Sequence, residues 1–314
     1  MQINAGTKKA SKRLTKFERK IVGQFFLYIS PWLIGFAAFT LVPMVMSLIY
    51  SFTNVVMATA NSMPLECIGL KNYIDLFSRD PDFLTSVSNT AVMAVFKVFF
   101  GTVFALLIAI LLNRKMPGKK IYRTLIYLPA VIPVVSVSLL WKLIFTGEMN
   151  IVNYLLSLIG VSPVNFFENG VSAKLTVIFV GVWSGLGPNM FIFLAALQGV
   201  PQDILEASEL DGAGAVQRFW HIVVPTVSST IFFVALTGMI GAMQSYADVK
   251  LLTDGGPGIS TTTMNMLIVR NAFASFGRKS LGYASAQAWV VFLIVMTLTV
   301  ITNYVAKRRE RKGA

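Results

Sequence analysis

The sequence predicts an all-α, polytopic membrane protein with six transmembrane helices, a helical cytoplasmic loop and both termini in the cytoplasm. Its mean hydropathy is +0.68, and only 13% of its 314 residues are charged. A soluble domain would carry about a quarter charged residues. Apolar runs of about 20 residues recur along the chain, and each is long enough to cross a hydrocarbon layer of about 30 Å.

Six apolar segments define one membrane domain over residues 24–306, flanked by short basic tails of residues 1–23 and 307–314. Several spans contain proline or glycine, and the fourth is expected to be broken at its GLGP sequence, residues 185–188. Such breaks are tolerated where neighbouring helices or a cavity satisfy the freed backbone groups. The expected spans are residues 24–50, 87–112, 125–145, 175–198, 227–246 and 283–306.

The distribution of basic residues predicts the orientation. Eighteen Lys and Arg residues fall on the side that holds both tails and the loops around 114–123 and 199–225, and seven fall on the other side. Because Lys and Arg concentrate on the cytoplasmic side of membrane proteins, both termini are expected there. Topology therefore explains the net charge of +13 better than nucleic-acid binding does. The basic N-terminus followed by an apolar run suits an uncleaved first span.

The residue inventory argues against several function classes. The lone Cys67 excludes an internal disulfide and a cysteine-based metal cluster, and the lone His221 argues against a histidine metal site. Few catalytic side chains are left for a membrane-embedded enzyme. A secondary transporter usually shows buried ionisable residues and an internal repeat, and neither is visible in the sequence. No G-x-x-x-x-G-K-[ST] motif is present, so the chain itself is not expected to bind ATP.

A polar, acidic loop over residues 199–225 separates the fourth and fifth spans. Asp203 and Glu206 favour a helix start, and Gly212 and Gly214 end or bend that helix. A second short helix should follow, which gives a helix–turn–helix on the cytoplasmic face. The pair lies either on lipid headgroups or against a partner protein. An anionic leaflet attracts basic helices rather than acidic ones, so partner docking is favoured.

This loop resembles a known motif. The groups Glu206-Ala207-Ser208 and Asp211-Gly212-Ala213 are followed by Ile222 and Pro225. Together they resemble the EAA loop of bacterial ABC importer permeases, whose pattern is E-A-A-x-x-x-G and then I-x-L-P. The departures are small: Ser208 replaces the second alanine, and Val224 replaces the leucine before the proline.

The resemblance extends over most of residues 24–306. It is carried by SPWLIGFAAFTLVPMVMSLIYSFT, YRTLIYLPAVIPVVSVSLLWKLIF, LTDGGPG and LGYASAQAWV, in this order. These segments resemble the carbohydrate-uptake branch, in particular its maltose-type first permease subunit. The resemblance implies a multi-pass bacterial inner-membrane protein that forms half of a sugar pathway and works by alternating access. It implies a transport subunit rather than an enzyme.

The resemblance also implies partners. These are a second homologous permease subunit, two ATPase subunits that bind ATP and Mg, and an extracytoplasmic sugar-binding protein; this chain would hold no cofactor or metal. The loop would be the coupling helix, with Gly212 making the close turn and Glu206 pairing with a donor on the ATPase. The implied coupling residues are Glu206, Ala207, Ser208, Asp211, Gly212 and Ala213.

A sugar path needs hydrogen-bonding side chains and aromatic faces inside the bundle. Polar groups at membrane depth are costly unless they face protein or water. The resemblance implies that the fourth and fifth spans supply the contacts. An interior amide can instead hold helices together, and tryptophan often marks the membrane interface, so both readings stay open. The candidates are Trp183, Asn189, Gln244, Ser245 and Tyr246.

Three further features belong neither to the implied coupling residues nor to the candidate sugar contacts. Lys97 lies inside the second span, where it lines water or pairs with a carboxylate, although no acidic residue within the spans is visible as its partner. Gly181-x-x-x-Gly185 has the spacing of a helix-packing face. The turn-rich outer segment, residues 248–280, is expected to meet the binding protein.

Overall fold

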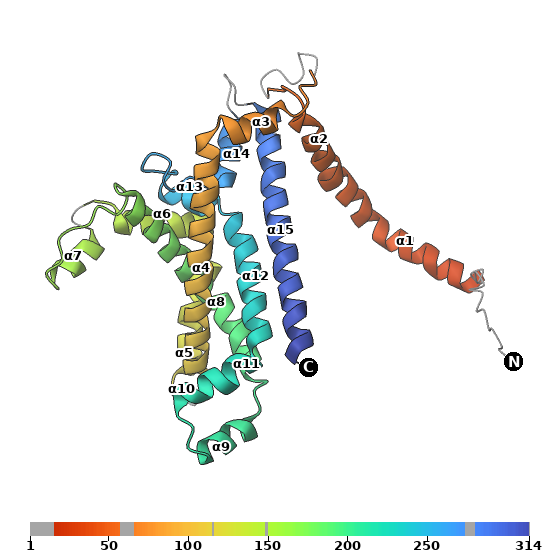
Figure 1. The fold of residues 1–314 in the computed structure, drawn as a ribbon. Helices are drawn as coiled ribbons and strands as arrows, with labels where there is room; N and C mark the ends of the chain where they lie inside the picture. Colours follow the sequence, from red (N-terminus) through yellow and green to blue (C-terminus); the bar gives the residue numbers. More distant parts are fainter. Residues whose placement is uncertain (1–15, 57–65, 115, 148–149, 274–279, 314) are drawn as a thin grey trace.

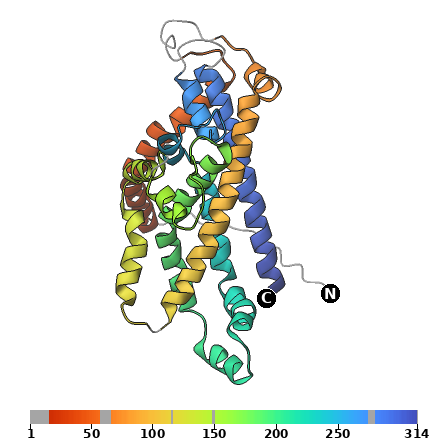
Figure 2. The ribbon, with the colours of Figure 1, turned by 90° about the vertical axis from the view of Figure 1, so that its left-hand side faces the viewer.

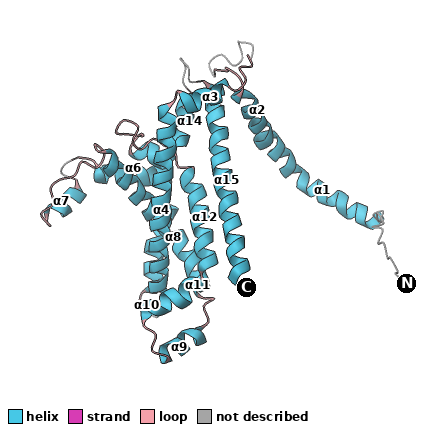
Figure 3. Cartoon of the chain, in the orientation of Figure 1, coloured by secondary structure: helices cyan, strands magenta, loops and turns pink. Residues whose placement is uncertain are grey.

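The computed structural model describes residues 16–56, 66–114, 116–147, 150–273 and 280–313, and these are mostly helical (Figure 3). The all-α class is confirmed: within these ranges the only β-type pairing is an isolated bridge between Thr53 and Cys67. The elements are α1 Lys16–Phe36, η1 Ala37–Leu41, α2 Val42–Ser51, α3 Lys71–Ser78, α4 Pro81–Asn113, α5 Lys119–Val131, α6 Val134–Phe145, α7 Ile151–Ser157, α8 Gly170–Leu197, α9 Gln202–Leu210, α10 Ala215–Arg218, η3 Phe219–Val223, α11 Val224–Thr226, α12 Ser228–Met243, α13 Ala247–Leu252, α14 Met264–Ala272 and α15 Leu281–Gly313.

The membrane-crossing elements agree with the sequence prediction in part. Four helical segments are long and apolar enough to cross a membrane: Gln24–Ser51, Pro81–Asn113, Gly170–Leu197 and Leu281–Tyr304. Two bent pairs, α5 with α6 and α10–α11 with α12, bring the number to six if each pair is one span. The described chain therefore has four to six spans.

Helices α4, α8, α12 and α15 form the central bundle (Figures 1 and 2). Its largest helix–helix contact is between α4 and α8. One core cluster joins Ala109 of α4, Phe193 of α8 and Val234 of α12, all of them buried. A second cluster joins Met243, at the end of α12, to Val290 and Val291 of α15. The apolar faces of these helices thus meet inside the bundle rather than facing lipid alone.

The third predicted span is broken. Helices α5 and α6 meet at an angle of 99° around Ile132 and Pro133, whose backbones are extended. A residue before proline is disfavoured in the helical region, and proline has no N–H to continue the ladder, so the helix stops here.

The fourth span is continuous, contrary to the expectation of a break at residues 185–188. Helix α8 runs through GLGP without interruption. Pro188 removes only the hydrogen bond that its N–H would have given to the carbonyl of Ser184. Helices α4 and α5 pack along α8, and these contacts support it through the missing bond.

The fifth span starts close to its predicted start at residue 227, and the chain is bent there. Residue Val227 has a backbone outside the helical region, and α11 and α12 bend there by 69°. The apolar part of the fifth span is therefore α12, and Pro225 belongs to the loop helices instead of starting the span.

The first apolar segment forms an arm, α1–η1–α2, that leaves the bundle (Figure 1). Its end, α2, packs against α15, whereas the most apolar stretch of Gln24–Ser51 buries none of its residues within the chain. This arm presents a long apolar surface that a bilayer or another subunit must cover.

Candidate functional site

Two regions carry the residues that the sequence singles out. The first is the loop between α8 and α12, which projects from the end of the bundle where α15 also ends (Figures 1 and 2). Helix α9 starts directly after Pro201, and Asp203 lies in its first turn. The predicted helix–turn–helix is present, with α9 as its first helix and α10, η3 and α11 as its second.

The turn after α9 has a defined geometry. Gly212 has φ +81°, a left-handed conformation that glycine adopts without strain. Its N–H donates to the Glu209 carbonyl, and the Ala213 N–H donates to the Ser208 carbonyl. These bonds satisfy carbonyls at the helix end. The predicted close turn at Gly212 is therefore observed in the backbone.

An ion pair ties the two halves of the loop together. Arg218 Nη1 lies 2.8 Å from Glu209 Oε2, which links α10 to the last turn of α9. On the opposite side, Leu205 packs against the core cluster of the bundle. Leu210 is 90% exposed, so the tip presents apolar as well as acidic surface. Among the predicted coupling residues, Glu206, Ala207, Asp211 and Gly212 are exposed, and Ser208 and Ala213 are half-buried.

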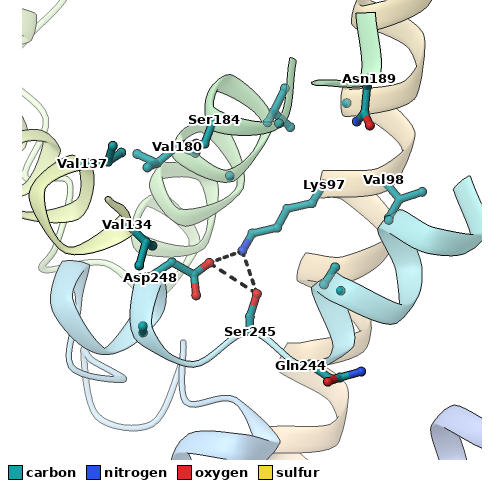
Figure 4. Close-up of a pocket in the computed structure, with 18 of the residues that line it drawn as sticks. Lys97, Val98, Val134, Val137, Val180, Ser184, Asn189, Gln244, Ser245 and Asp248 are labelled. Atoms are coloured by element: carbon teal, nitrogen blue, oxygen red, sulfur yellow. Dashed lines mark hydrogen bonds and ion pairs between the residues drawn. The ribbon is translucent and has the colours of Figure 1, made fainter. Parts of the chain in front are cut away.

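The second region is a cavity of about 440 Å³ among α4, α6, α8, α12 and the link to α13 (Figure 4). Valines from several helices form much of its wall. Its polar lining side chains are Lys97, Thr102, Ser138, Ser184, Asn189, Gln244, Ser245, Tyr246 and Asp248.

Four of the five predicted sugar-contact residues line this cavity. Asn189 comes from α8, and Gln244, Ser245 and Tyr246 form the link that follows α12. The cavity thus combines amides, a hydroxyl and an aromatic ring with apolar walls, a mixture typical of small-molecule sites.

Trp183 lies elsewhere. It is not among the lining residues, and its ring meets Trp141 of α6 edge-on with centroids 5.2 Å apart. Neighbouring positions on a helix point in different directions, so Ser184 lines the cavity and Trp183 packs behind it. Trp183 therefore makes a packing contact with Trp141 and does not line the cavity itself.

An ion pair stands in the cavity wall. Lys97 Nζ lies 2.8 Å from Asp248 Oδ2 and 3.2 Å from Ser245 Oγ, and the Ser245 hydroxyl donates to the same carboxylate at 3.3 Å. Burial raises the pKa of the Asp248 carboxyl, but the Lys97 ammonium and Ser245 outweigh it and hold this pKa below its ordinary value. The carboxyl group is thus ionised at neutral pH.

This pair decides between the two expectations for Lys97, because the lysine has a carboxylate partner. The partner, Asp248, follows the fifth span and lines the cavity, a contact that the sequence did not predict. The chain turns inward after α12, and α13 packs against α6 and α8. A signal was present in the sequence, because a charge inside an apolar span requires a partner and Asp248 is the first acid after the fifth span. The expected absence of buried ionisable residues, which argued against a secondary transporter, therefore does not hold.

Within the described residues, no group of three or more His, Cys, Asp and Glu side chains is placed to hold a metal ion.

The described part of the turn-rich segment, residues 248–280, is more closely packed than a free loop. Thr261, Thr262 and Thr263 are buried, and Asn89 of α4 donates to the carbonyls of Ile259 and Thr262 at 2.8 and 3.3 Å.

Comparison with known proteins gives consistent results. Residues 101–312 match the family described as binding-protein-dependent transport system inner membrane component. A probable ABC transporter permease protein of Bacillus subtilis, YesP, is 37% identical over 280 residues, which cover 88% of each chain. The sn-glycerol-3-phosphate transport system permease protein UgpA of Yersinia pestis is 33% identical over 248 residues, 78% of this chain and 82% of its own.

A solved structure shares the fold. A chain from the crystal structure of a bacterial alginate ABC transporter, in complex with an alginate pentasaccharide-bound periplasmic protein, superposes with a TM-score of 0.77. The match covers 94% of this chain and 98% of that chain at 21% identity.

Proposed function

This chain belongs to the family of binding-protein-dependent transport system inner membrane components, and on that basis we propose that it is the permease subunit of an ATP-driven importer of a carbohydrate. It is a multi-pass membrane protein of the bacterial inner membrane. The relatives that match over most of their length are transport permeases, and several are named for sn-glycerol-3-phosphate. The structural neighbour is named for the acidic polysaccharide alginate. These names support a hydroxyl-rich solute.

The proposed topology has six spans, with both tails and the loop of residues 199–225 in the cytoplasm. Each bent pair then counts as one span, and the membrane domain of residues 24–306 lies between tails of 1–23 and 307–314. Support comes from the shared end of the bundle, where α9 and the end of α15 lie together (Figure 1). The basic residues near Arg114 and Lys119 lie at the end of α4 and the start of α5.

The proposed coupling element is the protruding helix α9 with the turn that follows it. One observation carries this proposal: the EAA-type residues are exposed, while other residues of the same loop pack on the core of the bundle. Glu206 and Asp211 face outward, where an ATPase subunit can meet them. Leu205, Phe219 and Ile222 pack on the cluster shared by α4, α8 and α12. A push on α9 is therefore transmitted to the helices that line the cavity.

In the proposed cycle, closure of two partner ATPases on ATP and Mg moves this loop, and the cavity opens to the outside. A sugar delivered by an extracytoplasmic binding protein enters the cavity, where Asn189, Gln244, Ser245 and Tyr246 offer hydrogen bonds. A second homologous permease completes the pathway. The exposed arm of α1–α2 supplies apolar surface for that subunit or for lipid.

The test is Gly212→Asp, with Gly214→Ala as the matched control. Gly212 needs its left-handed backbone at φ +81°, whereas Gly214 has φ −67° and open space where an added methyl group would lie. We expect the first variant to reach the membrane but to lose ATP-driven sugar uptake, and the control to keep it. Normal uptake by Gly212→Asp would refute the coupling assignment.

Mild-detergent purification of the tagged chain from its own cell tests the assembly. We expect an ATPase and a second permease of similar size to accompany it. A stable chain isolated without an ATPase would instead indicate a transporter that works alone.

A further inference from the structure

Lys97 places a charged side chain inside an apolar helix, and such a charge calls for a functional or structural explanation. It lies near the middle of the 33-residue helix α4, with a side chain that is only 10% exposed. Lysines at membrane depth are costly and mark functional sites. Among the residues that line the cavity, Lys97 is the one cation and Asp248 the one anion.

The chain provides a built place for this lysine. Gly181 of α8 has no side chain, and a Cβ there would lie 2.8 Å from Lys97 Cε and 3.0 Å from its Cδ. The stem of Lys97 therefore crosses α8 through the space that the glycine leaves. This route brings the ammonium to the cavity wall beside Ser245 and Asp248 (Figure 4).

The contacts of the ammonium leave it able to take a further acceptor. An ammonium has three N–H donors, and two are directed to Asp248 and Ser245. The Ser245 hydroxyl also donates to Asp248, so this carboxylate keeps a partner if the lysine turns away. Asp248 lies in the first turn of the short helix α13, directly after the non-helical link of residues 244–246.

We propose that Lys97 recognises a negatively charged group on the transported carbohydrate, a carboxylate or a phosphate, and that Asp248 is the exchangeable partner that holds the lysine until the substrate arrives. This proposal rests on the proposed function and adds the substrate class. The other cavity residues, Asn189 and Gln244 among them, bind hydroxyl groups of any sugar. Lys97 alone offers a charge-assisted hydrogen bond, and such bonds discriminate more strongly than neutral ones.

The proposal predicts opposite effects for the two partners. Loss of Lys97 removes the donor for the anion, whereas loss of the Asp248 charge removes its competitor. If the ion pair only held α4 and α13 together, loss of either partner would weaken probe binding, and the two variants would have effects of the same sign. The sign of the Asp248→Asn effect therefore separates substrate recognition from a structural pair.

The experiment measures binding to the purified, assembled permease complex. The probes are a trisaccharide of uronic acids with its carboxyl-reduced neutral counterpart, and sn-glycerol 3-phosphate with glycerol. We expect one anionic probe to bind about tenfold or more tightly than its neutral match, since charge-assisted bonds have this strength. The probe pair that shows the preference identifies carboxylate or phosphate as the recognised group.

The variants complete the test. Lys97→Gln should abolish the preference of the complex for the anionic probe over its neutral match, and Asp248→Asn should increase that preference. Gly181→Ala keeps the charge but displaces the lysine stem, so it should weaken the preference. Lys142→Gln, a lysine of α6 outside the cavity lining, is the matched control and should change nothing.

The proposal is overturned if neither wild-type pair shows a preference, or if Lys97→Gln and Asp248→Asn lower anionic and neutral binding alike. If Lys97→Gln does not assemble, Gly181→Ala and Asp248→Asn still decide the matter, because they retain the lysine. ATP-driven uptake of a neutral sugar without any anion preference would leave the proposed function intact and remove only this inference.

Discussion

Gly187→Ala tests how closely helices α5 and α8 approach each other. A Cβ at Gly187 would lie 2.7 Å from the Tyr127 Cα and 2.8 Å from the Ile126 carbonyl oxygen. Ordinary carbon–carbon contact is about 3.5–4.0 Å, so the two backbones would have to separate by about 1 Å. Both obstacles are backbone atoms, which cannot move aside as the end of a flexible side chain can.

The expected cost follows from this geometry. Overpacking a close contact costs about 1–3 kcal/mol. The matched control is Gly185→Ala in the same helix, because its new methyl would meet only Asn189 Nδ2, at 3.9 Å. The assay is thermal unfolding of the detergent-solubilised protein, followed by the loss of the monodisperse species in size-exclusion chromatography. We expect the midpoint to fall by several degrees for Gly187→Ala and to change little for Gly185→Ala.

Equal midpoints for the two variants would refute this reasoning. They would show that α5 is free to move away from α8, so that the close approach carries no free energy. A lower unfolding midpoint for Gly185→Ala than for Gly187→Ala would indicate that the tight contact lies at Gly185.

Other contacts in the structure lead to three more predictions. Trp183→Ala should lower sugar uptake without dissociating the ATPase, because the ring packs on the buried cluster that includes Val137 and Val180 of the cavity wall; unchanged uptake would contradict this support. Asn89→Leu should cost about 1–3 kcal/mol, because the buried Thr262 carbonyl loses the Asn89 donor while the Ile259 carbonyl keeps only the Thr262 N–H, and hydrogen exchange over residues 254–263 should quicken; equal exchange rates would show that the segment is held by other bonds. Gly282→Ala should reduce the amount of protein in the membrane, since its Cβ would overlap the Thr53 carbonyl oxygen; a normal level in quantitative blots would count against that contact.

The features that the sequence predicted well are those set by local chemistry. Apolar run length identified the helices, and the glycine of the EAA-type motif predicted the turn at Gly212. Polar groups at membrane depth must face something polar, and Asn189, Gln244, Ser245 and Tyr246 do line a cavity, while their contact with a sugar stays a prediction. These inferences depend on residue type and spacing, which a sequence displays directly.

The features that were missed depend on how separate segments meet. The GLGP sequence predicted a break, yet α8 continues because neighbouring helices support it, and the real break falls at Pro133. The spacing of Gly181 and Gly185 predicted a packing face, whereas the closest backbone approach of α8 is at Gly187. Asp248 was placed outside because hydropathy ends a span where polarity begins, and hydropathy gives no sign that the chain turns back inward.

The arm of α1 and α2 has a consequence for how the protein is made. Its apolar stretch precedes all other spans and depends on none of them for burial, so it can insert from the ribosome as an independent helix. The pairs α5–α6 and α11–α12 differ from this arm, because they are bent by 99° and 69° and neither is one straight apolar helix. The cavity, in contrast, is lined by α4, α6, α8 and α12 and forms only when these later helices come together.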